Sequence, residues 1–290
     1  MSDAPPKDAP VTDTPAELAR AIAVHLEHRQ QFHGQRYVSG TAIENRAPSV
    51  EHAPASAPPP AGGAPQGRAE RSPPAATSRA PGRDPSAWTA VEKLQHLEFR
   101  VIGDCRRCVL CETRRHIVFG EGDAQARVMV VGEAPGADED RSGRPFVGRA
   151  GQRLDQWLGA VGLSRREVFI ANVLKCRPPN NRDPFGPEVD ACAKFLRAQI
   201  RAVQPALLVA LGRFAASALL GRPVRMHEVR GRLHTFRDAR DSVDRPVCVL
   251  YHPAYVLRRE RDARADASTV SENDAVLNDF RGALREVFRT

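Results

Sequence analysis

Residues 127–140 read RVMVVGEAPGADED, an apolar run that ends in a turn rich in glycine and proline. A short apolar run bounded by turn residues indicates a strand that is buried on both faces of a sheet. Three more runs of this kind follow, at residues 168–173, 206–211 and 247–251. We therefore expect four buried strands.

Longer stretches with helical spacing of apolar residues separate these runs. They cover residues 148–161, 187–203, 213–220 and 273–288, and residues 88–101 have the same spacing. Strands that alternate with helices predict a three-layer α/β/α domain with a short, mostly parallel central sheet. Ligands of such sheets bind beyond the carboxyl ends of the strands, so a site is expected in the loops that follow them.

The first 87 residues differ in composition from this domain. Residues 47–86 contain many of the 24 prolines, and such a segment cannot offset its ordering entropy by burial. We expect residues 1–87 to be a disordered extension and linker, with a short amphipathic helix at 15–33, and residues 88–290 to be the folded domain. The helix either docks a protein partner or has none.

Composition excludes some classes of protein. No apolar run approaches the ~18 residues that span a bilayer, and the N-terminus has no apolar signal region, so we expect no membrane partner and a cytoplasmic location. The net charge is +8, and nearly all of the 43 basic residues are arginine. This balance is typical of a nucleic-acid partner, although an arginine-rich solvated surface explains it as well.

The turn after the first strand carries Glu133, and residues 138–140 add three more acids. The turn lacks the Gly-Lys-Ser/Thr sequence of a Walker phosphate loop, and its carboxylates would repel phosphate. It therefore suits a catalytic site in which a carboxylate acts near a polarised bond or a water molecule. A solvated acidic turn is the alternative.

Other residues near the strand ends have recognition or proton-transfer chemistry. Phe146 lies in a polar loop, where it either stacks on a base or anchors the next helix. The amide of Asn172 can bond the edge of a base or be satisfied by backbone. His252, fixed by the next proline, can be an electrophile or a general acid, although lone histidines are usually structural. Arg258 and Arg259 follow and are candidates for phosphate binding.

The cysteines give the strongest chemical signal. In a reducing compartment, clustered cysteines are more often metal ligands than disulfides. Cys105-x-x-Cys108 places two thiolates on one metal, and Cys176 with Cys192 would complete a four-sulfur site for zinc or an iron–sulfur cluster. Cys111 is a third nearby sulfur, so residues 105, 108 and 111 form a rival set.

Taken together, these motifs resemble the family 4 uracil-DNA glycosylases, the iron–sulfur branch of the uracil-DNA glycosylase superfamily. The resemblance extends from about residue 105 to residue 258 and is looser up to residue 288. It rests on four motifs: Gly-Glu-Ala-Pro-Gly at 132–136 followed by acids at 139–140, Arg-Pro-Phe-Val-Gly at 144–148, Asn172 before Lys-Cys-Arg-Pro-Pro, and His-Pro-Ala-Tyr at 252–255.

The resemblance implies a monofunctional DNA repair enzyme that hydrolyses the N-glycosidic bond of deoxyuridine in DNA. It releases uracil and leaves an abasic site for base excision repair. The implied cofactor is a [4Fe-4S] cluster on the cysteines at 105, 108, 176 and 192, with Cys111 and Cys248 as non-ligands. From the residue alone, Cys248 is most simply a buried apolar side chain. The implied partner is uracil-containing DNA, and we expect a monomer.

The resemblance also implies roles in a uracil pocket. Phe146 stacks on a flipped-out uracil, Asn172 reads its pairing edge, and His252 donates to the oxygen that gains charge as the bond breaks. Glu139 crowds position 5 of the base and excludes thymine, and Glu133 orients water. The remaining expected contacts are Ala134 and Pro135 with the base, and Arg177, Arg182, Arg258 and Arg259 with DNA.

Some features depart from the family pattern or leave alternatives open. Ala137 stands where the family often has an acid, so it supplies no carboxylate. A related branch forms a covalent bond to DNA through a histidine in a basic insert after the Asn strand. No such histidine follows Asn172, so we expect no covalent capture of DNA. Residues 259–273 are longer and more polar than expected, and predict a loop at the DNA face or a disturbed last helix. The alternatives to the enzyme are a catalytically silent or differently specific DNA-binding member of the fold, and an accessory protein that acts through its N-terminal segment.

Overall fold

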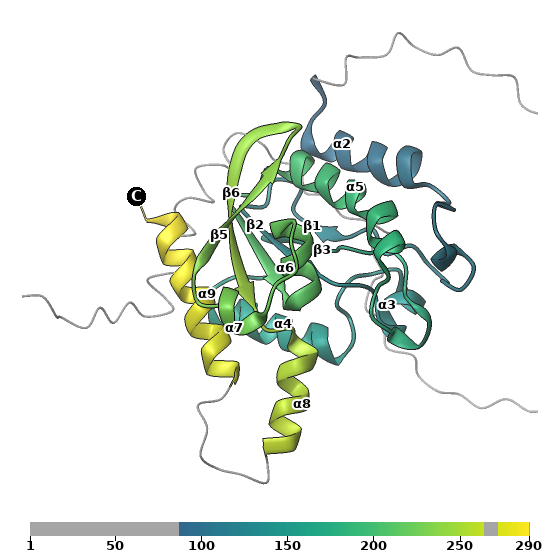
Figure 1. The fold of residues 1–290 in the computed structure, drawn as a ribbon. Coiled ribbons are helices and arrows are strands. Elements are labelled where there is room, and N and C mark those ends of the chain that lie inside the picture. The colour runs from purple at the N-terminus through teal and green to yellow at the C-terminus, as the bar shows by residue number, and fades with distance from the viewer. Residues whose placement is uncertain (1–86, 264–271, 290) are drawn as a thin grey trace, which may run out of the picture. The chain divides into compact units, whose positions relative to one another are not determined.

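The computed structural model describes residues 87–263 and 272–289 (Figure 1). The predicted helix at 15–33 and the linker at 47–86 lie outside these ranges, so the domain division at residue 87 stays a prediction. None of the described helices combines the length and the apolar character needed to cross a membrane.

A six-stranded sheet forms the centre of the described domain. Four strands, in the order β3-β2-β4-β6, run parallel, and short β1 and β5 pair antiparallel at the two edges. The prediction of a mostly parallel sheet is confirmed, and the four predicted strands are its parallel ones. The strands are β1 (Glu121–Gly122), β2 (Val128–Gly132), β3 (Val168–Asn172), β4 (Leu207–Leu211), β5 (Leu233–Asp238) and β6 (Asp241–Leu250).

Five of the described helical segments lie where apolar spacing predicted them, near residues 88–101, 148–161, 187–203, 213–220 and 273–288. The helices at 137–142, 226–229 and 253–263 were not predicted. The α-helices are α2 (Ala90–His96), α3 (Ala137–Ser142), α4 (Arg149–Ala160), α5 (Gly186–Val203), α6 (Gly212–Leu220), α7 (Met226–Val229), α8 (Pro253–Ala263) and α9 (Glu272–Phe288). Shorter turns are η2 (Leu97–Ile102), which continues α2 as a π-helix, and the 3-10 helices η3 (Val109–Cys111) and η4 (Pro179–Asn181).

The sheet separates two hydrophobic cores because successive side chains of a strand point to opposite faces. Met129 and Val131 of β2 pack in one core with residues of α2, α5 and α6. Val128 and Val130 pack in the other core with residues of α4, α8 and α9. Helices therefore cover both faces, as Figure 1 shows for α5 and α9, and the three-layer α/β/α prediction is confirmed.

Three elements differ from the sequence predictions. The β5–β6 hairpin was not predicted because the first half of β6 is mostly exposed and polar. The acids after Gly136 lie in the first turn of α3, where negative charge is favourable, rather than in an irregular turn. The expectation of a loop from residue 259 is wrong up to residue 263, because α8 continues through this stretch. Ion pairs anchor it there: Arg259 pairs with Glu272 of α9, and Glu260 pairs with Arg153 of α4.

Candidate active site and cysteine pocket

Asn172 is the last residue of β3 and lies opposite Gly132, the last residue of β2. Its side chain is 1% exposed, and its Oδ1 atom accepts no hydrogen bond from any described residue. An unpaired buried acceptor costs about 1–3 kcal/mol, so this atom is either strained or reserved for a ligand. The alternative that neighbouring backbone satisfies Oδ1 does not hold.

Phe146 and Asn172 meet above Gly132. A Cβ atom built on Gly132 would overlap both Asn172 Oδ1 and the Phe146 ring, so only glycine leaves these two groups room. The Phe146 ring is 6% exposed, and its centroid lies 6.0 Å from that of the His252 ring. The structure therefore brings together the three residues predicted to stack on, read and polarise a base.

The backbone of Phe146 has a φ of +54°, in the left-handed region that costs a non-glycine residue about 1–3 kcal/mol. Arg165 holds this conformation from the loop before β3. Its Nη1 donates to Phe146 O (3.0 Å) and its Nη2 to Pro145 O (2.7 Å). The same guanidinium pairs with Glu121 and Asp155. Sequence reasoning missed Arg165, because its partners are distant in the chain and nothing in its local pattern marks it.

Glu139 also fixes the Phe146 loop. Its Oε1 accepts from the N–H groups of Val147 and Gly148, both at 2.9 Å, and its Oε2 accepts from Gly136 N–H at 3.0 Å. Buried Asp140 likewise accepts from backbone N–H groups, those of residues 115 and 116. Glu139 and Asp140 thus link separate loop segments through hydrogen bonds from backbone N–H groups. The predicted contact of Glu139 with position 5 of a base stays a prediction.

His252 lies between β6 and α8. Its Nδ1 is 3.2 Å from Ala254 N, and because a backbone N–H can only donate, Nδ1 is the acceptor. The ring proton of the neutral form therefore resides on Nε2. Burial, assisted by the charge of Arg258 and opposed by that of Glu139, lowers the pKa of His252 to about 4. At neutral pH this residue is an uncharged hydrogen-bond donor.

Glu133 follows β2 and is half-buried, next to half-buried Ala134 and buried Pro135. Burial raises the pKa of Glu133 to about 7, the charge of Asp183 adds to the shift, and Arg213 opposes it. A carboxyl group with this pKa exchanges its proton near neutrality, which suits a general base.

The predicted DNA-binding arginines fall into two kinds. Arg177 and Arg258 have no carboxylate partner among the described residues. Arg182, in contrast, makes a two-pronged ion pair with buried Glu188 (2.6 and 2.9 Å), and Arg259 pairs with Glu272 (2.9 Å). Arg177 donates from Nε to Asn181 Oδ1 (2.8 Å), which leaves its charge uncompensated, like that of Arg258, whereas the charges of the other two are already compensated.

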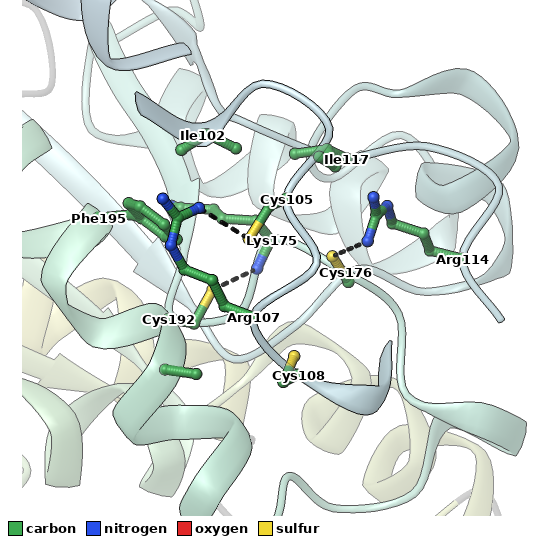
Figure 2. A pocket seen from close by; sticks show the side chains of 11 residues that line it. Ile102, Cys105, Arg107, Cys108, Arg114, Ile117, Lys175, Cys176, Cys192 and Phe195 are labelled. Atoms are coloured by element: carbon green, nitrogen blue, oxygen red, sulfur yellow. Dashed lines mark hydrogen bonds between the residues drawn. The ribbon is translucent and has the colours of Figure 1, made fainter. Parts of the chain in front are cut away.

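The four predicted ligand cysteines line a single hollow, shown in Figure 2. Cys105 and Cys108 come from the segment before the sheet, Cys176 from the segment after β3, and Cys192 from α5. Cys111 does not line it. No group of three or more His, Cys, Asp or Glu side chains in the described ranges is arranged to hold a metal ion. The remaining cysteine, at position 248, is buried in the core, as predicted.

Cations surround these sulfurs. Arg107 Nη1 lies 3.4 Å from Cys105 Sγ, and Arg114 Nη1 lies 3.8 Å from Cys176 Sγ. Figure 2 shows both contacts as dashed lines. Burial raises the pKa of the Cys176 thiol to about 12, so a thiolate there requires a bound metal. Arg114 also pairs with Asp104 (2.7 Å), so its charge is partly compensated. A hollow with four sulfurs and N–H donors beside them fits an anionic, thiolate-bound metal centre.

Lys175 is a buried cation near these sulfurs that sequence reasoning missed. It is 1% exposed, and its Nζ donates to Asn172 O (2.7 Å) and to Gln199 Oε1 (2.6 Å). Burial lowers its pKa to about 8, while the charges of the Cys192 and Cys176 thiolates oppose the shift. The ammonium therefore lies between Asn172 and the cysteine pocket.

A comparison with known protein families matches most of the described domain. The sequence model of the Uracil DNA glycosylase superfamily matches residues 119–280, from just before β1 to within α9. The chain belongs to this superfamily.

Similar proteins point to one branch of the superfamily. The chain is 45% identical over 173 residues to the type-4 uracil-DNA glycosylase of Pyrobaculum aerophilum, a match that covers 58% of this chain and 85% of the relative. It is 44% identical over 164 residues to the type-4 enzyme of Archaeoglobus fulgidus (55% and 81% covered) and 42% identical over 168 residues to that of Thermotoga maritima (58% and 85% covered). The expected resemblance to family 4 is confirmed.

Proposed function

We propose that this chain is a DNA repair glycosylase that hydrolyses the N-glycosidic bond of deoxyuridine in DNA. It releases uracil and leaves an abasic site for base excision repair. The observation that carries this function is the unpaired Oδ1 of Asn172 beside the Phe146 ring. Uracil presents an N3–H donor to such an acceptor, whereas cytosine presents a lone pair. The mismatch costs about 1–3 kcal/mol, which discriminates between the two bases.

The base must leave the DNA stack to reach buried Asn172, and extruding it costs a few kcal/mol. Stacking on Phe146 returns part of that energy, at about 1–3 kcal/mol per base. The left-handed backbone at Phe146, braced by Arg165 and Glu139, sets the ring position before the base arrives. Binding therefore requires little reorganisation of the loop.

Bond cleavage needs stabilisation of a leaving uracil anion. As the bond between N1 and C1′ breaks, the electron pair moves into the base, and His252 donates its Nε2–H to the oxygen that gains charge. Because His252 is neutral at pH 7, it acts as a hydrogen-bond donor rather than as a full proton source. Glu133 orients a water molecule and accepts its proton as the water oxygen bonds to C1′.

We infer that Cys105, Cys108, Cys176 and Cys192 hold a [4Fe-4S] cluster. The shared hollow and the surrounding cations support this inference. A bound cluster would supply negative charge and cross-link three chain segments. Hydrolysis transfers no electrons, so its role is structural.

The proposed DNA contacts are phosphate contacts by Arg177 and Arg258, the two arginines without carboxylate partners. We propose that the enzyme acts as a monomer. The amphipathic pattern at residues 15–33 supports a protein-binding segment that acts separately from the glycosylase domain.

A uracil-release assay tests the proposal. The full-length chain is purified without oxygen, its iron content is measured, and it is incubated with an oligonucleotide that contains one uracil. We expect free uracil and an abasic site without strand cleavage, because no lysine among the site motifs is placed to form a Schiff base. Iron-containing protein that releases no uracil would contradict the proposal and favour the silent DNA-binding alternative.

A further inference from the structure

The uracil pocket and the cysteine pocket are joined by a very short stretch of chain. Asn172 ends β3, and Cys176 follows four residues later. The stretch is also bonded to the catalytic loop, because Val173 N–H donates to Gly132 O and Leu174 N–H donates to Glu133 O, both at 2.9 Å. A displacement at Cys176 would therefore reach both sides of the uracil pocket.

Lys175 makes the most direct link within this stretch. Its ammonium donates to the backbone carbonyl of Asn172, and its backbone N–H donates to Cys192 Sγ at 3.3 Å. Gln199 of α5 accepts a second hydrogen bond from the ammonium and donates in turn to Phe119 O. The side chain thus bridges the residue that reads the base and the helix that carries a ligand cysteine.

The Lys175 ammonium has no carboxylate counter-ion among the described residues. No Asp or Glu in the described ranges pairs with it, and burying an unpaired ammonium is strongly unfavourable. Lys175 lines the same hollow as Cys176 and Cys192, so negative charge on these sulfurs would favour the ammonium. A thiolate-bound cluster supplies that charge in the place where the lysine needs it.

We propose that Lys175 is a positioning residue that couples the cysteine-bound cluster to Asn172. The anionic cluster holds the ammonium, and the ammonium holds the Asn172 backbone, so the base-reading amide is correctly placed when the cluster is bound. This inference rests on the proposed function and its cofactor, and it gives an iron–sulfur cluster a specific task in a hydrolytic enzyme.

The first test replaces the lysine by an uncharged side chain of similar length. We expect K175M to retain iron but to bind DNA containing a non-hydrolysable deoxyuridine analogue about tenfold more weakly. The matched control is K194M, which removes an exposed lysine of α5 that touches Phe195 but not Asn172. Wild-type affinity in iron-loaded K175M would overturn the coupling.

A double-mutant cycle separates positioning from general loss of structure. If Lys175 acts through Asn172, K175M lowers affinity in the wild-type background but causes no further loss in N172A. Multiplicative losses in the double variant would show that Lys175 acts elsewhere and would overturn the proposal. Should K175M fail to fold, Q199L replaces it in the same cycle, because it removes the second anchor of the ammonium. Wild-type affinity in iron-loaded Q199L would then count against the link.

A redox titration tests the cluster half of the link without reference to activity. A positive charge close to the cluster stabilises an added electron, so K175M is expected to have a more negative midpoint potential than the wild type and K194M. An unchanged potential would overturn the contact between Lys175 and the cluster. If the wild-type chain releases no uracil, the proposed function fails, while this titration still decides whether the lysine and the cluster interact.

Discussion

The uracil pocket and the cysteine pocket differ in what each one lacks. The uracil pocket contains a buried acceptor, Asn172 Oδ1, that has no donor among the described residues and lies beside the Phe146 ring. The cysteine pocket contains cations close to its sulfurs. Among the described residues, no Asp or Glu pairs with its buried lysine, Lys175. The first pocket is therefore complementary to a neutral base that donates, and the second to an anionic centre. Variants should accordingly affect turnover in one pocket and cofactor content and stability in the other.

The largest effect on turnover is expected from His252→Ala. Loss of one preorganised donor to a developing anion lowers kcat about 10²–10³-fold. The iron content and the Tm should stay close to those of the wild type, since the histidine contacts no cysteine. Single-turnover kinetics, iron analysis and thermal unfolding measure the three quantities. A drop in iron content would break the separation between the pockets.

The complementary variant is Cys176→Ala. It removes a proposed cluster ligand, so we expect loss of bound iron and a lower Tm, with loss of activity as a consequence. The control is Cys111→Ala, which removes a cysteine outside the hollow and should keep its iron. Loss of iron in Cys111→Ala but not in Cys176→Ala would instead favour the rival ligand set of Cys105, Cys108 and Cys111.

A smaller effect is expected from Arg165→Ala. Without its two hydrogen bonds to the carbonyls of Pro145 and Phe146, the left-handed backbone at Phe146 relaxes and the ring loses its position. We expect kcat/KM to fall about thirtyfold, in line with ~1 kcal/mol for each of the two lost hydrogen bonds. Arg166→Ala is the control, because this neighbouring arginine is exposed. Similar losses in both variants would assign the effect to charge alone.

The pH profile tests Glu133 against His252. The raised pKa of Glu133 makes its carboxylate dominant only above about pH 7, so kcat/KM should decline as the pH falls below that value. Because the pKa of His252 is lowered to about 4, the histidine should add no step between pH 5 and pH 8. Glu133→Gln should be slower and should lack the decline near pH 7. A decline that persists in this variant would exclude Glu133 as its source.

The smallest effects concern the arginines at the DNA face. Arg258→Ala should weaken DNA binding a few-fold and reduce the slope of log affinity against log salt by about 0.9, the value for one phosphate contact on duplex DNA. Arg182→Ala should leave that slope nearly unchanged and instead lower the Tm, because it leaves Glu188 buried without its partner. Equal slopes for the two variants would contradict the distinction between free and compensated arginines.

The sequence predicted the parallel strands because each is a short apolar run, and it placed Phe146, Asn172 and His252 at one edge of the sheet because that edge collects strand ends. It could not predict the bracing by Arg165 or Glu139, since both depend on backbone groups that meet only in the folded chain. It also gave no sign that Lys175 is buried, because lysine is almost never fully buried unless it is paired. The β5–β6 hairpin was missed for a related reason, as its polar half carries no apolar pattern.

The uracil pocket is sensitive to any substitution of Gly132. A Cβ atom at this position would overlap both Asn172 Oδ1 and the Phe146 ring. Every missense change of a glycine codon adds at least that one carbon, so no amino-acid replacement at this position is small enough to be silent. The chain could keep its strands, its cysteines and its iron and still lose the base-reading amide. A screen for inactive but well-folded variants should therefore recover substitutions here.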